Sequence, residues 1–130
     1  MNSDVLTVFA DMMAAAGLGT VGTNIFIGQL PAEINGIYLV RLGGTMNNYL
    51  PIEETLVDVY IQNINAQTAV QTAETIKRTF HRHLETGSDE QFIYTILALS
   101  NIDDLGRDQE YGKMYKITFE IEHRATAIIS

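Results

Sequence analysis

The feature that most constrains the fold of this chain is a long amphipathic segment, Ala66–Leu84. Its apolar residues recur at steps of three and four, the spacing of one face of an α-helix. They are Ala66, Ala69, Val70, Ala73, Ile76, Phe80 and Leu84. Asn65 can cap this helix by accepting a hydrogen bond from a free amide of the first turn, and Gly87 can end it. A long helix with a single apolar face needs a sheet to cover, so we expect the rest of the chain to supply strands.

The size and composition of the chain fit one folded domain spanning residues 1–130. Of its 130 residues 46% are hydrophobic and only 2 are proline, which predicts a globular core without a disordered tail. No apolar run reaches the roughly 18–20 residues that span a bilayer, and residues 1–4 lack the basic segment of a signal peptide, so we expect no membrane partner. The chain has no cysteine, which excludes disulfides and thiolate chemistry.

The order of hydrophobic patterns predicts an α+β fold, α-β-β-β-α-β-β, in which two helices pack on a mainly antiparallel, mixed β-sheet. Besides the long helix, the predicted elements are a helix over Ser3–Ala16 and strands over Asn24–Ile27, Ile37–Leu42, Glu54–Gln62, Phe92–Leu99 and Tyr115–Glu122. Thr45–Pro51 has no period and is predicted to be a loop. The last strand alternates apolar and polar residues, so one face is buried. We expect Phe119 on that face to meet Phe80 where the helix packs on the sheet.

A glycine-rich turn, Gly17–Gly22, matches the spacing of the GxGxxG dinucleotide fingerprint. That fingerprint requires a strand to enter the loop and a helix to leave it, so that the helix N-terminus faces the pyrophosphate. Here the predicted order is the reverse, with a helix entering and a short strand leaving. A structural turn is therefore favoured over a nucleotide site.

A long acidic connection, Asn101–Gly112, joins the last two predicted strands. It is longer than a hairpin requires, and loops of this kind are often functional. It lacks the alternating ligands and the bidentate glutamate of an EF-hand, and Arg107 competes for the adjacent Asp103 and Asp104. We therefore interpret it as a solvated loop rather than a calcium site.

No other pattern in the chain indicates a reaction. His81 and His83 would point about 200° apart on a helix and cannot share a metal ion. His123 has no visible partner and is interpreted as a surface or edge residue, and Asp58 is assigned to the solvated face of its strand. The chain has no GxSxG elbow and no P-loop lysine. The sequence thus predicts no catalytic, cofactor-binding or metal site.

The arrangement resembles the tail terminator proteins of long-tailed bacteriophages, also called minor capsid or tail-to-head joining proteins. The likeness runs over nearly the whole chain. It includes the segment Asn24–Pro31, the strand that ends at Leu42–Gly44, and the strand Leu56–Ile61 that enters the long helix. The segment Leu105–Gly112, followed by an alternating strand that ends at His123–Arg124, resembles the hairpin of this family.

This resemblance implies a structural virion protein without an active site. Such proteins form a homo-oligomeric, hexameric ring that caps the tail tube, stops its growth and meets the head–tail connector. The chain would then act in the phage tail or neck, after assembly in the host cytoplasm. DNA would pass through the ring without specific binding, which fits a net charge of −8 because nucleic-acid binders need basic surface. We expect acidic residues to line the opening.

Subunit contacts are predicted on the polar side of the sheet and on the acidic connection. The prediction rests on the length of that connection and on the tyrosines near it, since aromatic residues are favoured in interfaces. The candidate interface residues are Asp103, Asp104, Leu105, Arg107, Asp108, Glu110 and Tyr111. Lys113, Lys116 and Arg124 are expected at subunit or head-side contacts, paired with nearby acids.

Two alternatives stay open from the residues alone. One is a small enzyme or ligand-binding domain with a pocket between helix and sheet. The other is an oligomerisation adaptor of a phage-like particle.

Overall fold

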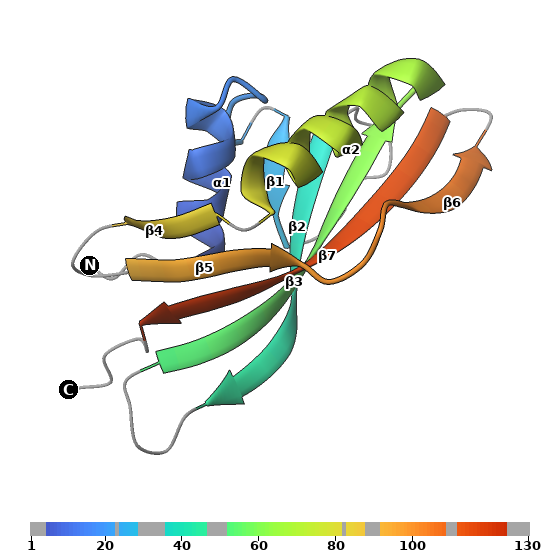
Figure 1. Ribbon diagram of the computed structural model, residues 1–130. Coiled ribbons are helices and arrows are strands. Elements are labelled where there is room, and N and C mark those ends of the chain that lie inside the picture. Colours follow the sequence, from blue (N-terminus) through green and yellow to red (C-terminus); the bar gives the residue numbers. More distant parts are fainter. Residues whose placement is uncertain are drawn as a thin grey trace.

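Figure 1 shows the chain as a computed structural model, in which both helices lie on one face of a single β-sheet. The structure describes residues 5–22, 24–28, 36–46, 52–81, 83–87, 92–108 and 112–124. The elements are α1 Val5–Ala15, β1 Ile25–Ile27, β2 Gly36–Met46, β3 Ile52–Asn63, α2 Ala66–Phe80, β4 His83–Gly87, β5 Phe92–Ala98, β6 Asp103–Asp108 and β7 Gly112–Arg124. Neither described helix is long and apolar enough to cross a membrane.

The seven strands form one sheet in the order β1-β2-β3-β7-β5-β4, and β6 adds to β7 beside that path. Among the described strands, every pairing is antiparallel except that of β1 with β2, which is parallel. The long strand β7 pairs with β3 along one edge, from Lys113 to Arg124. Along its other edge β6 pairs with the first part of β7 and β5 with the last part. Strand β7 is therefore the centre of the sheet.

The predicted fold class is confirmed, and the predicted helices and strands occur in the predicted order. The structure adds β4 and β6, which the sequence did not indicate. Strand β3 is longer than predicted, and β2 continues to Met46, so the predicted loop over Thr45–Pro51 was wrong at its start. The rest of that loop, residues 47–51, lies outside the described residues. Helix α1 enters the glycine-rich turn and β1 leaves it, as expected.

Helix α2 begins as predicted and ends earlier. The Asn65 side chain accepts hydrogen bonds from the backbone N–H groups of Gln67 (3.0 Å) and Thr68 (3.1 Å), which confirms the cap. The helix ends at Phe80, and residues 83–87 instead pair with β5 as β4. The prediction that the helix reaches Leu84 was wrong. It rested on the position of Leu84, four residues after Phe80, which fits the helical period. In the structure the backbone of this segment instead forms its hydrogen bonds with β5 in the sheet.

The core lies between the two helices and the inner face of the sheet. Phe80 from α2 and Phe119 from β7 are both buried, as predicted, but they meet through a third ring. Phe9 of α1 packs edge-on against Phe80, with ring centroids 5.2 Å apart, and against Phe119, at 5.5 Å. These T-shaped contacts join both helices to the central strand.

Candidate functional site

The predicted interface segment forms a β-hairpin rather than a loop. Asp103–Asp108 is strand β6, in which Asp103 pairs with Lys116 and Asp104 with Tyr115 of β7. Asp103, Asp104 and Leu105 are exposed there. For the predicted residues Arg107 and Asp108 the structure describes only the backbone, while Glu110 and Tyr111 lie outside the described residues. The structure thus brings the described part of this set together on one strand.

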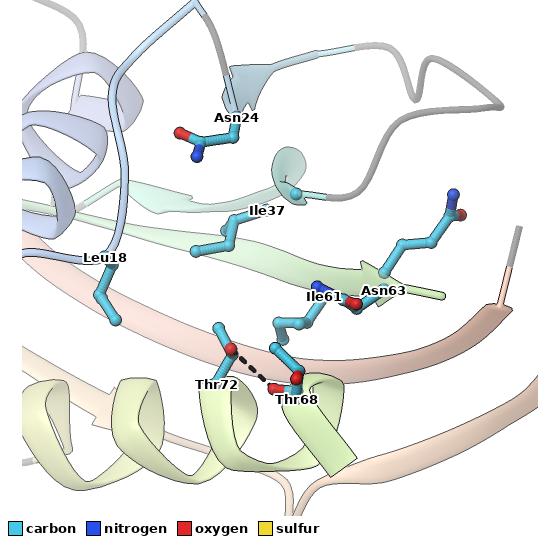
Figure 2. Close-up of a pocket in the computed structure, with 9 residues that line it drawn as sticks. Leu18, Asn24, Ile37, Ile61, Asn63, Thr68 and Thr72 are labelled. Carbon is cyan, nitrogen blue, oxygen red and sulfur yellow. Dashed lines mark hydrogen bonds between the residues drawn. The ribbon is translucent and has the colours of Figure 1, made fainter. Parts of the chain in front are cut away.

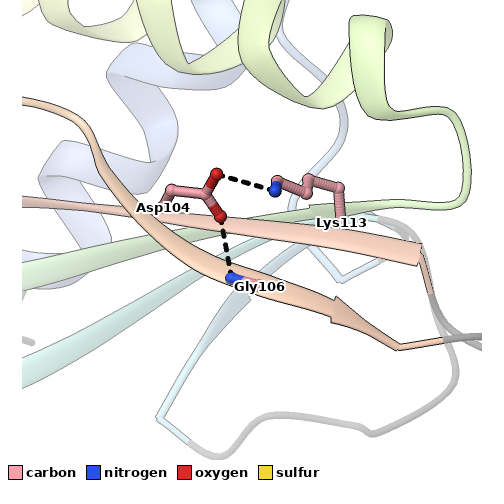
Figure 3. Close-up of polar contacts among 3 residues, drawn as sticks. All are labelled: Asp104, Gly106 and Lys113. Carbon is pink, nitrogen blue, oxygen red and sulfur yellow. Dashed lines mark hydrogen bonds and ion pairs between the residues drawn. The ribbon is translucent and has the colours of Figure 1, made fainter.

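A bulge in β6 is held by one aspartate and one lysine (Figure 3). The Asp104 carboxylate accepts a hydrogen bond from the Gly106 backbone N–H at 2.8 Å and forms an ion pair with Lys113 Nζ at 2.7 Å. The register with β7 shifts between Asp104 and Arg107, where Gly106 adopts a φ of 97°. The hydrogen bond from Lys113, and then that from Gly106, lowers the pKa of Asp104 below its ordinary value. The expected pairing of Lys113 with an acid therefore occurs within the subunit.

The other end of the hairpin rests on the junction between β3 and α2. Gly112 opens β7 with a φ of 90°, in the left-handed region that favours glycine. A side chain there would collide with the backbone of Asn63 and Ile64. The hairpin can therefore approach this junction closely only because residue 112 is glycine.

The hairpin and the connection that leads into it expose two large apolar side chains. Leu105 on β6 is 46% exposed, and Leu99, just after β5, is 53% exposed. They lie within seven residues of each other, in a segment that otherwise carries mostly polar residues. Short edge strands with charged residues resist edge-to-edge aggregation, and β6 carries three aspartates and one arginine. An exposed leucine among such charges is suited to a specific contact.

The sheet face opposite the helices contains a buried carboxylate, which corrects the assignment of Asp58 to a solvated face. Asp58 is only 5% exposed. Its Oδ1 accepts a hydrogen bond from Thr118 Oγ1 at 2.6 Å, and its Oδ2 accepts one from the Tyr60 hydroxyl at 3.3 Å. Burial, and then the nearby Asp58 carboxylate, raises the pKa of Tyr60. The alternation of side chains along the strand predicts correctly that Asp58 lies on the face opposite the helices. It does not reveal that two hydroxyl groups cover the carboxylate on that face.

Three glutamates gather further along the same face. Glu54 on β3 lies opposite Glu122 on β7, and Glu120 lies two residues before Glu122 on the same face. Burial raises the pKa of Glu120, and the proximity of Glu54 and then Glu122 raises it further. This face therefore concentrates negative charge.

Two of the three histidines lie elsewhere than the sequence suggested: His123 is buried and His83 belongs to a strand, whereas His81 is exposed. His123 is 1% exposed, and its Nε2 lies 2.7 Å from Thr55 Oγ1 in a hydrogen bond, so its assignment to the surface was wrong. The pairing of β7 with both β3 and β5 encloses it. His81 caps the end of α2, and its Nδ1 accepts a hydrogen bond from the Ala98 backbone N–H at 3.0 Å. His83 belongs to β4, so the two do not share a helix.

One cavity, of about 240 Å³, lies between the α1–β1 turn and the first turns of α2 (Figure 2). Its lining residues are Leu18, Asn24, Gly36, Ile37, Ile61, Gln62, Asn63, Thr68 and Thr72. The Thr72 hydroxyl donates a hydrogen bond to the Thr68 carbonyl at 2.8 Å. None of these nine described residues titrates, so the cavity itself supplies no general acid or base. Within the described ranges, no group of three or more histidine, aspartate or glutamate residues is placed to hold a metal ion.

Comparisons with known proteins agree with the resemblance in the sequence. Residues 12–123 match the family described as Bacteriophage tail terminator protein. No curated protein sequence matches the chain. The family match begins within α1, stops one residue before the end of β7 and so covers nearly the whole sheet. The chain therefore belongs to the bacteriophage tail terminator family, whose members are structural proteins of the phage tail.

Proposed function

We propose that copies of this chain assemble into a hexameric ring that caps the tail tube, stops its growth and joins the tail to the head–tail connector. The observation that carries the proposal is the β6–β7 hairpin. The core is complete within one subunit, since Phe9, Phe80 and Phe119 are buried by its own helices and sheet. Leu105 is not needed for that core, and its exposure on a short, charged strand suits a contact between subunits.

Genome DNA would pass through this ring without specific binding. The chain carries 16 acidic and 8 basic residues, so a ring of identical subunits repeats an excess of negative charge. Glu54, Glu120 and Glu122 share the helix-free face and are the candidates to border the opening. A duplex near such a wall is repelled, within a screening length of about 8–10 Å. An electrophoretic shift assay at low salt should give no shift, and tight, salt-sensitive binding would contradict a passive conduit.

The capping function can be tested with the cognate tail tube protein, which polymerises into tubes that electron microscopy can measure. Adding this chain should shorten the tubes and place a ring at one end of each. Adding the connector protein should then extend the density at that end. Tubes of unchanged length with bare ends would contradict the proposal. In infected cells the free protein should be found in the cytoplasm and the assembled protein in the virion tail.

A further inference from the structure

An open groove of about 560 Å³ lies beside the last turns of α2, between this helix and the connection from β5 to β6. Glu74, Lys77, Arg78, His81, Asn101 and Ile102 line it, and we name it the α2 groove. Two hydrogen bonds join its walls. Lys77 Nζ donates to Asn101 Oδ1 at 2.7 Å, and the Ala98 backbone N–H donates to His81 Nδ1 at 3.0 Å. The groove is therefore fixed within the subunit before any partner arrives.

The chemistry of the α2 groove fits a partner that is both acidic and apolar. Lys77 and Arg78 bring two cationic side chains to the groove, against one carboxylate, that of Glu74. Ile102 lines it with a partly buried apolar side chain, and Leu99, on the same connection, is largely exposed. An interface needs such an apolar centre with charges around it.

The β6 strand has the complementary composition. The exposed Leu105 follows Asp103 and Asp104, both of which are also exposed. In its own subunit Leu105 does not line the α2 groove, and its strand pairs with β7. The exposed Leu105 side chain is therefore available to the α2 groove of another copy of the chain.

We infer that Leu105 of one subunit inserts into the α2 groove of the next subunit, with Asp103 of the first facing Arg78 of the second. The inference rests on the proposed ring and names the two surfaces that meet in it. Because the hairpin and the groove are different surfaces, the contact is head-to-tail. Such a contact closes into a ring when its rotation fits, whereas a contact between two identical surfaces stops at a dimer.

Mixing two damaged subunits tests this geometry. Leu105→Asp should destroy the hairpin surface, and Arg78→Glu should destroy the groove surface. Both residues are exposed, so each variant should retain the circular dichroism spectrum and melting temperature of the wild type. By analytical ultracentrifugation each variant alone should be monomeric. Their mixture should form a dimer of one copy of each and nothing larger, since only one of the two possible junctions is intact.

The controls place similar changes outside the contact. Val21→Asp puts an acid at another exposed apolar position, and Thr79→Glu puts one beside Arg78 at a residue that does not line the groove. Both should form rings like the wild type. Rings formed by either Leu105→Asp or Arg78→Glu, or by their mixture, would overturn the inference but leave the proposed function. A wild-type protein that stays monomeric at every concentration would overturn both.

Cysteine crosslinking tests the same contact independently, in case one of these variants fails to fold. The chain has no cysteine, so Leu105→Cys and Arg78→Cys each introduce a single thiol. A short bis-maleimide should join the two variants when they are mixed and should leave each variant alone uncrosslinked. Crosslinks within the Leu105→Cys sample alone would mean that hairpins meet hairpins, and would overturn the head-to-tail contact.

Discussion

Strand β7 passes through two regions of opposite character. From Ile117 to Ile121 its inward side chains are buried beneath the helices, and Phe119 contacts the ring of Phe9. From Lys113 to Lys116 the same strand is partly exposed and pairs with β6. The first region is held by apolar packing. The second combines backbone pairing, the ion pair between Lys113 and Asp104, and the Tyr115 side chain, which is partly buried against the core.

This difference separates what the subunit needs to fold from what it can offer to partners. The helix-covered region places its large apolar side chains inside the subunit. The hairpin keeps its shape through a bulge at Gly106, a close approach at Gly112 and the partial burial of Tyr115, while Leu105 stays exposed. Its exposed leucine is therefore free to contact another molecule. Changing the core rings should accordingly affect stability, whereas changing the exposed Leu105 side chain should affect assembly.

The largest effect on stability is expected from Phe9→Ala. This ring contacts both Phe80 and Phe119, and truncating a buried phenylalanine costs about 3–5 kcal/mol of unfolding free energy. Urea denaturation followed by circular dichroism measures the loss. Leu105→Ala, in the hairpin, should change the same free energy by less than about 0.5 kcal/mol. Similar losses for both variants would mean that the hairpin is part of the folding core.

Gly112→Ala should come next. Backbone strain alone costs about 1–3 kcal/mol, and the collision of the added Cβ should make the loss larger than that. An alanine at a φ of 90° is strained, and its Cβ would also collide with the backbone of Asn63 and Ile64. Gly106→Ala is the matched control, since residue 106 has a similar φ of 97° and nothing within 4 Å of an added Cβ. Thermal unfolding should show the larger drop for residue 112. Equal drops in melting temperature for the two variants would mean that the positive φ, and not the collision with Asn63 and Ile64, causes the loss.

A smaller loss, about 1–3 kcal/mol, is expected from Thr118→Ala on the helix-free face. The substitution removes the hydroxyl that donates to the buried Asp58, and a buried acceptor that loses its donor is costly. Thr118→Ser keeps a hydroxyl and should recover most of the stability in the same denaturation assay. If serine and alanine are equally destabilising, the lost methyl group rather than the hydrogen bond is responsible.

The smallest effects should have opposite signs for two carboxyl groups, Glu120 on the helix-free face and Asp104 in the hairpin. Burial raises the pKa of Glu120, so its charged form opposes folding at neutral pH, and this cost disappears as the pH falls through the folded-state pKa. Glu120→Gln should therefore raise the melting temperature at pH 7 and have little effect near pH 3. The Lys113 contact lowers the pKa of Asp104, so its charge favours folding above the unfolded pKa near 4, and that stability is lost as the pH falls further.

Asp104→Asn should accordingly lower the melting temperature at pH 7, with the difference vanishing at low pH. Scanning calorimetry of both variants from pH 3 to pH 8 compares them directly. Two variants that shift the melting temperature in the same direction would contradict the opposite pKa shifts of these two carboxyl groups.

Periodicity was enough to predict the helix-covered region. The alternation of Tyr115–Glu122 and the three- and four-residue steps of α2 place Phe80 and Phe119 on facing surfaces, because burial enforces these periods. The role of Phe9 between them depends on how α1 sits on the sheet, and no local pattern contains that information.

The hairpin and the polar contacts were harder to predict. Aspartate and glycine are depleted in strands, so β6 had no strand signal, and it forms because β7 extends beyond β5 and leaves an edge to pair. Asp58 and His123 have polar side chains that suggest solvent, yet hydroxyls 60 or more residues away in sequence satisfy them. Such long-range partners cannot be found by reading the chain in short windows.

Native mass spectrometry of the purified wild-type protein, beside the Leu105→Asp variant, shows whether this fold makes a closed ring through its hairpin. We expect one dominant species of six subunits for the wild type, with a ring in negative-stain images, and a folded monomer for the variant. A wild-type monomer, an open filament or a dimer, or a variant that forms the same hexamer, would contradict it.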